Sequence, residues 1–320
     1  MRRLILELFL LLAFMGVVYG LLEWRYRDYS IGLDGQYAQF RMEQTQAEVL
    51  FLGNSHIIPL KAASDSMRKV RSASLAFVGM DLFWTKVLLN RQQDALPRLK
   101  EVILYADPEI LGYNQTLHGQ AWINRALYRY GDTLYNDRLS DRWMARSNFF
   151  RSNRDLSYLF RERNGSAELP IVRDRLSLPL DDTIACKVRA IENSRSRFDE
   201  RLFPENLRYL NTILDCCKQH GWQVTLVRTP KRSAFLRYFE HAGIERARLK
   251  LDSLAKARGL FLFEPGWSAE DDRLIADPDH LLLDGAKRFL EELDSAKEHH
   301  ARESGMGNPD SISFSMTTGK

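Results

Sequence analysis

The sequence predicts an α/β protein with an open, doubly wound parallel sheet and one apolar helix at its N-terminus. Short apolar runs, typical of buried strands, alternate with longer stretches that have helical spacing. Such alternation is typical of βαβ units, in which the strands are parallel and helices cover the sheet. Because ligands of these sheets bind beyond the carboxyl ends of the strands, we expect any site to lie there.

The composition is that of an ordinary globular protein without a large excess of charge. The 320 residues are enough for one large α/β domain plus an anchor, or for two small domains. Lys and Arg total 46, Asp and Glu total 42, and no basic stripe is interleaved with aromatic residues. We therefore expect no nucleic-acid partner.

The N-terminal segment Leu4–Leu22 is apolar except for Glu7. At a rise of about 1.5 Å per residue, a helix of this length crosses a hydrocarbon core of about 30 Å. Trp24 and Tyr26 follow it, as is typical of a membrane interface. Because no convincing small-x-small cleavage site is present, residues 1–27 are predicted to be an uncleaved signal anchor. The alternative is a buried core helix.

The charges around this segment do not decide which side of the membrane holds the body. Arg2 and Arg3 precede the segment, whereas Arg25 and Arg27 follow it. The two sides of the segment therefore carry nearly equal numbers of positive charges, and the positive-inside rule does not decide its orientation.

Five strands and four helical stretches are expected after a short spacer over residues 27–48. The strands are predicted at Val49–Leu52, Ala73–Val78, Val102–Tyr105, Gln223–Val227 and Leu260–Phe263. The helical stretches are predicted at Leu82–Asn90, Glu205–His220, Ser233–Arg258 (interrupted near Gly243) and Asp284–Lys297. Gly221 is a typical stop for the second helix, and Asp284 can cap the last one.

Two regions do not follow this alternation. Residues 115–201 are rich in Arg, Asp, Asn and aromatic residues. We expect there a long insertion that serves as a lid or substrate platform, or else a solvated and partly disordered excursion. Residues 301–320 are predicted to be a disordered tail, which leaves residues 28–300 for the folded domain.

The three cysteines do not predict a metal centre. Cys186, Cys216 and Cys217 show no CxxC or Cys/His ligand spacing, so neither a metal nor a cofactor is expected. Cys186 can pair with one of the other two in an oxidising compartment. The alternative is three unpaired, partly buried thiols.

A serine follows the first predicted strand, in the block Gly53-Asn54-Ser55-His56. A tight turn at the end of a buried strand exposes the hydroxyl of Ser55 above the sheet. Backbone N–H groups in such a turn can stabilise an oxyanion. Because a Gly-x-Ser after a strand is common, this block does not define a site by itself.

A second block, Asp277-Pro278-Asp279-His280, precedes the last predicted helix. A serine hydroxyl needs a base, and an imidazole needs a carboxylate that fixes its tautomer. Asp277 can reach back to Nδ1 of His280 across a loop that Pro278 stiffens, and Asp279 is a competing partner for the same ring. The alternative is a surface turn followed by a helix cap.

The order of these two blocks resembles that of the SGNH (GDSL-like) hydrolases. In that superfamily a serine block lies at the first strand, and an Asp-x-x-His block lies before the last helix. The resemblance implies that Ser55 is the nucleophile, that His280 is its acid–base partner and that Asp277 orients the imidazole. It also implies a three-layer α/β/α fold.

Further motifs resemble a membrane-anchored branch of bacterial envelope proteins, which includes polysaccharide O-acetyltransferases such as those of alginate. The matching motifs are Gly53–His56, Leu75-Ala76, Asp279-His280-Leu281 and Gly285-Ala286. Leu282 stands where that branch has Asn. The resemblance covers residues 49–107 and 222–292, outside the insertion. It implies a single-pass protein of the inner (cytoplasmic) membrane whose body lies on the periplasmic side.

The resemblance also implies an oxyanion hole, completed by a Gly after the second strand and an Asn after the third. Gly79 fits the first role. The expected Gly-x-Asn-Asp is missing after the third strand, where Tyr105-Ala106-Asp107 stands. Because a carboxylate at Asp107 would repel an oxyanion, Asn114 is the better candidate electrostatically, although its position fits poorly.

Four other polar residues lie near the predicted site. We expect His56 to point away from the Ser55 hydroxyl and to have a structural or substrate-contacting role. Arg228, Lys231 and Arg232 lie at the carboxyl end of a predicted strand. They are expected either to bind an anionic substrate or to form a solvated basic loop.

Two functions from different classes fit these motifs. The first is a serine-dependent acyl-ester hydrolase or O-acyltransferase of the cell envelope. Its substrate is expected to be an acylated carbohydrate or glycolipid, with a membrane protein as a candidate acyl donor. The second is a catalytically inactive envelope protein that uses the same fold to bind glycan or to scaffold polysaccharide synthesis. The missing Asn block motivates the second function.

Overall fold

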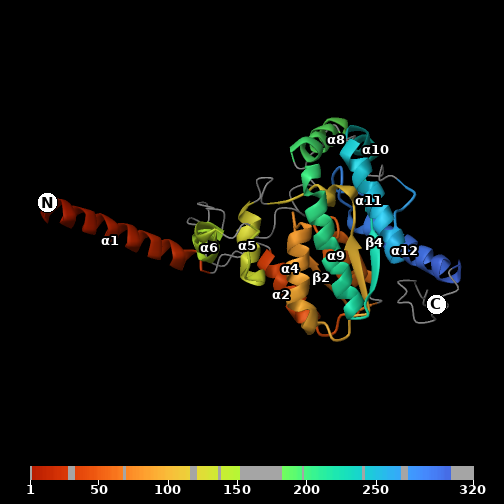
Figure 1. Cartoon of the computed structure of the whole chain (residues 1–320), viewed down its shortest axis with the longest axis horizontal. Coiled ribbons are helices and arrows are strands. Elements are labelled where there is room, and N and C mark those ends of the chain that lie inside the picture. The colour runs from red at the N-terminus through yellow and green to blue at the C-terminus, as the bar shows by residue number, and fades with distance from the viewer. Residues whose placement is uncertain are drawn as a thin grey trace.

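The computed structural model has a five-stranded parallel sheet at its centre, with the strand order β2-β1-β3-β4-β5 (Figure 1). The strands are β1 (Val49–Gly53), β2 (Ser72–Ala76), β3 (Glu101–Tyr105), β4 (Gln223–Val227) and β5 (Phe261–Phe263). The structure describes residues 2–27, 33–67, 70–115, 121–135, 138–151, 182–196, 198–239, 242–267 and 273–303. The predicted α/β class with a parallel sheet is confirmed.

Helices pack in pairs against the sheet. On the side that faces the viewer in Figure 1, α4 (Leu82–Gln92) packs beside α9 (Phe203–Gln219). A second pair is formed by α3 (Ile58–Met67) and α12 (Leu283–Glu303). All residues of β1 and β3 are buried, as expected for central strands that are covered on both faces.

The observed elements differ from the expected ones in a few places. The predicted spacer contains a helix, α2 (Leu33–Glu43), whose Leu33 and Phe40 are buried in the core. The helix α3 was not expected either, and β2 ends two residues before Val78. The stretch that was expected to break near Gly243 forms two helices, α10 (Ser233–Tyr238) and α11 (Ala242–Arg258).

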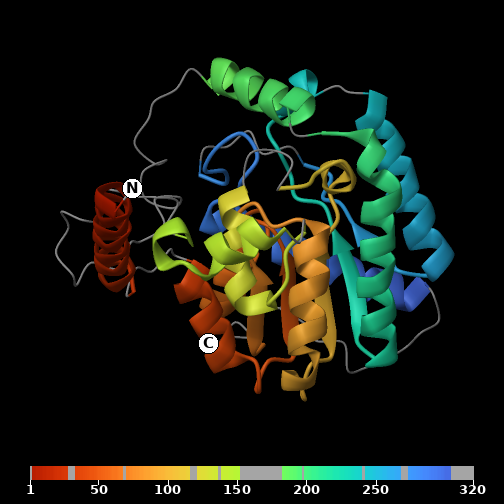
Figure 2. The same ribbon diagram turned by 60° about the vertical axis from the view of Figure 1, so that its left-hand side comes forward.

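The described parts of the predicted insertion are helical. Its first part contains α5 (Ala121–Gly131), α6 (Leu139–Arg146) and α7 (Asn148–Arg151), and α5 packs on α4. Its last part is α8 (Asp182–Ile191), which continues as a π-helix over Glu192–Ser196 and packs on α10. Figure 2 shows these two parts on different sides of the body. The predicted tail lies outside the described residues from 304 onward.

The N-terminal helix α1 (Arg2–Arg25) projects from the body (Figure 1). It is long and apolar enough to cross a membrane, with a mean hydropathy of 2.4 over its best window. None of its residues is buried. The alternative of a buried core helix is therefore wrong.

The three cysteines are buried thiols in two different places. Cys186 lies in a small apolar cluster with Phe235 and Phe239. Cys216 and Cys217 belong to the main core between α9 and the sheet. The structure therefore contains no disulfide between Cys186 and either of the others.

Candidate active site

The turn after β1 places Ser55 at the carboxyl end of the sheet. Gly53 has φ +146°, and a Cβ atom there would lie 2.5 Å from the Cβ of Tyr105 on β3, so glycine is required. The side-chain oxygen of Asn54 accepts the N–H of His56 at 3.1 Å, and its carbonyl accepts the N–H of Ile57 at 3.1 Å. These bonds hold the serine at the tip of a closed turn.

The loop before α12 is held by Asp277. Its Oδ1 accepts the backbone N–H groups of Asp279 at 3.0 Å and His280 at 2.9 Å. The backbone N–H of Ala276 donates to the carbonyl of His280 at 2.8 Å, which closes the loop from the other side. These backbone hydrogen bonds hold the carboxylate of Asp277 in place independently of its contact with a histidine ring.

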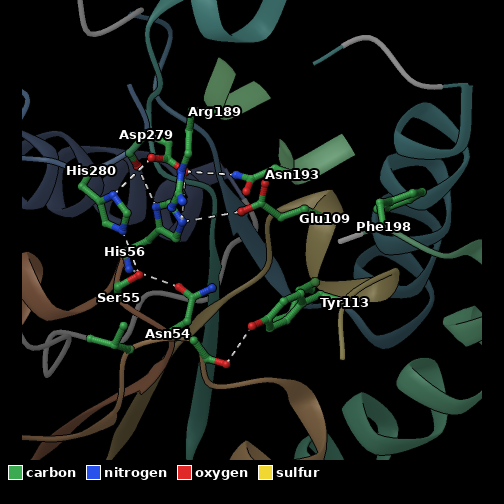
Figure 3. A pocket seen from close by; sticks show the side chains of 13 residues that line it. Asn54, Ser55, His56, Glu109, Tyr113, Arg189, Asn193, Phe198, Asp279 and His280 are labelled. Carbon is green, nitrogen blue, oxygen red and sulfur yellow. Dashed lines mark hydrogen bonds and ion pairs between the residues drawn. The ribbon is translucent and has the colours of Figure 1, made fainter. Parts of the chain in front are cut away.

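The two blocks meet at this edge of the sheet (Figure 3). The Nε2 of His280 lies 2.8 Å from the Oγ of Ser55, and its Nδ1 lies 2.9 Å from Oδ1 of Asp277. Because Nδ1 donates its proton in a hydrogen bond to the carboxylate of Asp277, the unprotonated ring has Nε2 free to accept the hydroxyl proton of Ser55. The structure thus brings together the three residues that the sequence motifs single out, in the arrangement of a nucleophile, a base and an orienting carboxylate.

Asp279 lies close to the same nitrogen of the His280 ring. Its carboxylate is completely buried, and its Oδ1 lies 3.2 Å from Nδ1 of His280. Its Oδ2 lies 3.4 Å from both Nε of Arg189 and Nδ2 of Asn193, which belong to the insertion. Asp277 is the closer partner of the imidazole, and Asp279 adds a second negative charge beside it.

The ring of His56 is stacked between two other rings. It lies parallel to His280 at a centroid distance of 4.3 Å and parallel to Tyr105 at 5.1 Å. Its Nδ1 donates to the backbone carbonyl of Asp279 at 2.7 Å, and its Nε2 lies 3.6 Å from Oε1 of Glu109. His56 therefore does not contact the Ser55 hydroxyl as a base would, although it lines the site.

The two histidines have opposite pKa shifts. Burial lowers the pKa of His280, but the carboxylates of Asp279 and Asp277 outweigh burial and raise this pKa to about 9. Burial and the positive charge of His280 lower the pKa of His56 to about 3. Burial opposes ionisation of Asp277 and Asp279, yet the cationic His280 lowers the pKa of both carboxyl groups.

A buried charge network lies behind His56. The Nζ of Lys231 lies 3.1 Å from Oδ2 of Asp107 and 3.2 Å from Oε2 of Glu109. Thr229 donates to Asp107 at 3.1 Å, and Tyr105 donates to Glu109 at 2.7 Å. Burial lowers the pKa of Lys231, but the two carboxylates outweigh it and raise this pKa.

This network corrects what the sequence suggested for the basic loop. Arg228, Lys231 and Arg232 are all buried, so the loop is not solvated. Arg228 pairs with Asp252 at 2.6 Å and with Glu264 at 3.0 Å, away from the cavity. Lys231 neutralises carboxylates inside the protein, and Arg228 neutralises two carboxylates that are partly exposed, so the expected role in binding an anionic substrate is wrong for Arg228 and Lys231.

A cavity of about 190 Å³ opens beside Ser55. From the core of the fold it is lined by Asn54, Ser55, His56, Val78, Gly79, Glu109, Ile110, Tyr113, Asp279 and His280. The insertion adds Arg189, Asn193 and Phe198. The sequence did not single out these three residues, because no local pattern marks a residue that reaches a site from a distant helix.

The two expected oxyanion residues lie in different places. Gly79 lines the cavity and has φ +67°, a left-handed conformation that favours glycine. Asn114 is buried and is not among the residues that line the cavity. Asn54, which replaces the common Asp of the serine block, lies next to Ser55 in the cavity wall (Figure 3). It is the better-placed amide of the two.

The same side chains offer a set of ligand atoms for a metal ion. Among the described residues, His56, Asp279 and His280 present three nitrogen or oxygen atoms within 4.8 Å of one another. The guanidinium of Arg189 lies 3.4 Å from Asp279, however, and a cation there repels a metal ion. Both ring Nδ1 atoms are also engaged by Asp277 or by a backbone carbonyl. The donor set therefore fits a proton relay better than a metal centre.

Comparisons with known proteins identify no relative in sequence. No family model and no curated protein matches the chain. The fold is similar to a structure described as a "putative acylhydrolase" of Bacteroides fragilis, with 10% identity and a TM-score of 0.41, over 83% of this chain and 95% of that one. It is also similar to a GDSL-like lipase of Bacteroides thetaiotaomicron, with 10% identity and a TM-score of 0.38, over 84% and 96%. At these scores the likeness carries no argument about activity, so the functional assignment rests on the geometry of the site.

Proposed function

We propose that this protein is a serine-dependent acyl-ester hydrolase or O-acyltransferase that α1 holds at a membrane. The observation that carries the proposal is the continuous relay from the hydroxyl of Ser55 through His280 to Asp277, with distances of 2.8 and 2.9 Å. The relay opens directly into the cavity. A serine with this partner set is an activated nucleophile for acyl groups.

The reaction follows from the positions of the protons. The Oγ of Ser55 attacks the acyl carbonyl while Nε2 of His280 takes the hydroxyl proton, and Asp277 stabilises the imidazolium. The backbone N–H groups of Ser55 and Gly79 stabilise the oxyanion. Collapse of the tetrahedral intermediate breaks the ester bond, and His280 returns the proton to the leaving alcohol. Water or a second alcohol then attacks the acyl-enzyme by the same steps.

The cavity and the anchor support a particular class of substrate. A volume of about 190 Å³ suits a short acyl group. The polar groups of Asn54, Glu109, Arg189 and Asn193 line the same cavity and suit the hydroxyls of a sugar. We therefore propose an acylated carbohydrate or glycolipid of the cell envelope as the substrate, with the body on the periplasmic side of the inner membrane. If the acyl group is transferred, a membrane protein is the proposed donor.

The proposal is tested by labelling the purified full chain with a fluorophosphonate, which reacts with activated serines. Wild type is expected to be labelled and Ser55→Ala is expected to remain unlabelled. Ser66→Ala is the matched control, because Ser66 is exposed on α3 and its hydroxyl donates to the carbonyl of Ala63 at 2.8 Å. Equal labelling of wild type and Ser55→Ala would overturn the assignment of the nucleophile.

The position of Asn114 favours a second candidate function, a glycan-binding protein without catalysis. Asn114 does not line the cavity, so the side-chain donor that the resemblance implied for the oxyanion is missing there. A Ser55→Ala/His280→Ala variant separates the two functions. Glycan binding and full complementation by this variant in cells would favour the second function, whereas loss of complementation would favour the enzyme.

A further inference from the structure

The helix α6 presents an apolar surface beside the end of α1 that the proposed reaction does not use. Leu139 and Trp143 of α6 are 85% and 53% exposed, and their spacing of four places them on the same face of the helix. Trp24, near the end of α1, is 55% exposed. Large apolar side chains that gather on one surface indicate a binding partner.

This surface is joined firmly to α1. The carboxylate of Glu23 accepts a hydrogen bond from the hydroxyl of Ser147 and the backbone N–H groups of Asn148 at 2.9 Å and Phe149 at 3.4 Å. It thereby caps the first turn of α7. Because a side chain of the anchor satisfies these donors, α7 is tied to the anchor directly.

Aromatic contacts fix the same junction. The ring of Tyr19 stacks on Trp143 at a centroid distance of 5.7 Å. Tyr26 is completely buried, and its ring meets the edge of Phe149 at 5.3 Å. Tyr19 lies six residues before the end of α1, which is about 9 Å along the helix. Trp143 is therefore held at the depth where the apolar helix approaches its last turns.

We propose that α6 and α7 rest on the lipid bilayer next to the point where α1 enters it. Indole and phenol rings are enriched at the boundary between headgroups and acyl chains, which is the level of Tyr19, Trp24 and Trp143 on a membrane-crossing α1. Leu139 lies one helical turn from Trp143 and enters the same layer. The surface continues that of α1, which already has the length and hydropathy to cross the membrane.

The charges around this surface identify lipid as the occupant. Arg138, Arg142 and Arg146 are exposed around the apolar face of α6. Amphipathic helices that lie on anionic membranes combine cationic and apolar side chains in this way.

The contact also orients the body. The helix α6 packs on α5, and α5 packs on α4, which covers the sheet. The side chains of Arg129 and Tyr130 of α5 also bond to Asp34 of α2. A continuous series of packed helices therefore runs from the bilayer to the sheet, and the cavity is held in one direction relative to the membrane.

The test measures lipid contact on the full chain in liposomes of phosphatidylcholine and phosphatidylglycerol. An environment-sensitive NBD label is attached to Leu139→Cys, and the matched control is Leu249→Cys on α11, where Leu249 is 56% exposed. Wild type gives the background, because its three cysteines are buried. We expect a blue-shifted emission at position 139 and at least a twofold quenching by doxyl-labelled lipid, with neither change at position 249.

Two outcomes would overturn the proposal. Identical emission and quenching at positions 139 and 249 would show that α6 stays in water. A blue shift at 139 without quenching by lipid, together with disulfide-linked dimers of Leu139→Cys, would assign the surface to a second copy of the chain. The charge argument is tested by Arg138→Glu/Arg146→Glu, which is expected to reduce the quenching when phosphatidylglycerol is present. Fluorophosphonate labelling of Ser55 is scored separately, so failure of either proposal is recognised independently.

Discussion

Two buried histidines lie 4.3 Å apart with parallel rings, and their surroundings give them opposite properties. The Nδ1 of His280 faces two carboxylates, at 2.9 Å and 3.2 Å. The Nδ1 of His56 faces a neutral backbone carbonyl, and the nearest carboxylate oxygen to its Nε2 is 3.6 Å away. Both rings are buried, so burial alone does not decide which of them holds a proton. The carboxylates lie closer to His280 than to His56, and the positive charge of His280 further lowers the pKa of His56.

The comparison suggests a division of roles. In the proposed reaction, His280 exchanges a proton with Ser55, whereas His56 remains neutral and packs against the ring of His280. A neutral ring at that place keeps a second positive charge away from the imidazolium that forms during acyl transfer.

Replacement of the two histidines is expected to have very different effects. His280→Gln removes the base and should lower kcat/KM for a short-chain ester by about 10⁴-fold. His56→Gln keeps a donor toward the carbonyl of Asp279 and should lower it by about tenfold. Steady-state kinetics on both purified variants measure the difference, and equal losses would contradict the division of roles.

The two carboxylates beside His280 are expected to differ as well. Asp277→Asn should lower kcat by about 10³-fold, because the amide no longer fixes the tautomer in which Nε2 accepts the serine proton. Asp279→Asn should cost far less, since Asp277 still holds the ring. A larger loss in Asp279→Asn than in Asp277→Asn would make Asp279 the orienting carboxylate.

Lys231 pairs with Asp107 and Glu109 beside His56, and its positive charge lowers the pKa of His56. Lys231→Met leaves Asp107 and Glu109 buried without their cation, and should lower the free energy of unfolding by about 3–5 kcal/mol. The control is Lys100→Met, because Lys100 is 62% exposed and its loss should change stability by about 0.5 kcal/mol or less. Denaturant unfolding measures both.

The same variant should also bring the two histidines closer in pKa. The positive charge of Lys231 lowers the pKa of His56, so its loss should raise that pKa. Titration of the histidine ring protons by NMR in the folded variant checks this. An unchanged pKa of His56 would show that burial and the charge of His280 are enough to keep it neutral.

The pH dependence of the reaction is expected to follow His280. Its pKa is raised to about 9, so the base is protonated at neutral pH and kcat/KM should rise with pH until about that value. Asp279→Asn removes one of the carboxylates that raise the pKa, so the rising limb should move to lower pH. A pH–rate profile that rises near 6.5 in both proteins would contradict the assignment.

Much of the sheet and the centre of the site could be predicted from local patterns. The apolar runs that became β1, β3 and β4 are continuous because helices cover both faces, and glycine or proline follows them. The serine and Asp-x-x-His blocks were visible because each is contiguous in the sequence. The fold then joined them, as expected for two loops at the carboxyl edge of one sheet.

The rest depended on contacts that no local pattern records. The helix α2 has helical apolar spacing at Leu33, Tyr37 and Phe40, but it is short and polar on average, so its packing on the core was not foreseen. Arg189 and Asn193 reach the cavity because α8 packs on α10, a contact that a single sequence does not reveal. The basic loop was expected to face solvent or substrate. Its pairing with carboxylates could not be predicted, because these carboxylates come from other segments of the chain.

The large separation of Ser55 and His280 in the chain has a consequence for biosynthesis. The two residues are 225 positions apart, and α12, which follows the histidine, packs on α3, which follows the serine. At 5–20 residues per second, the ribosome takes roughly 10 to 45 seconds to make this interval. During that time the N-terminal helix can reach the membrane while the serine has no proton acceptor. In the proposed reaction, the nascent polypeptide therefore cannot attack esters around it, and its reactivity begins only after His280 has been synthesised.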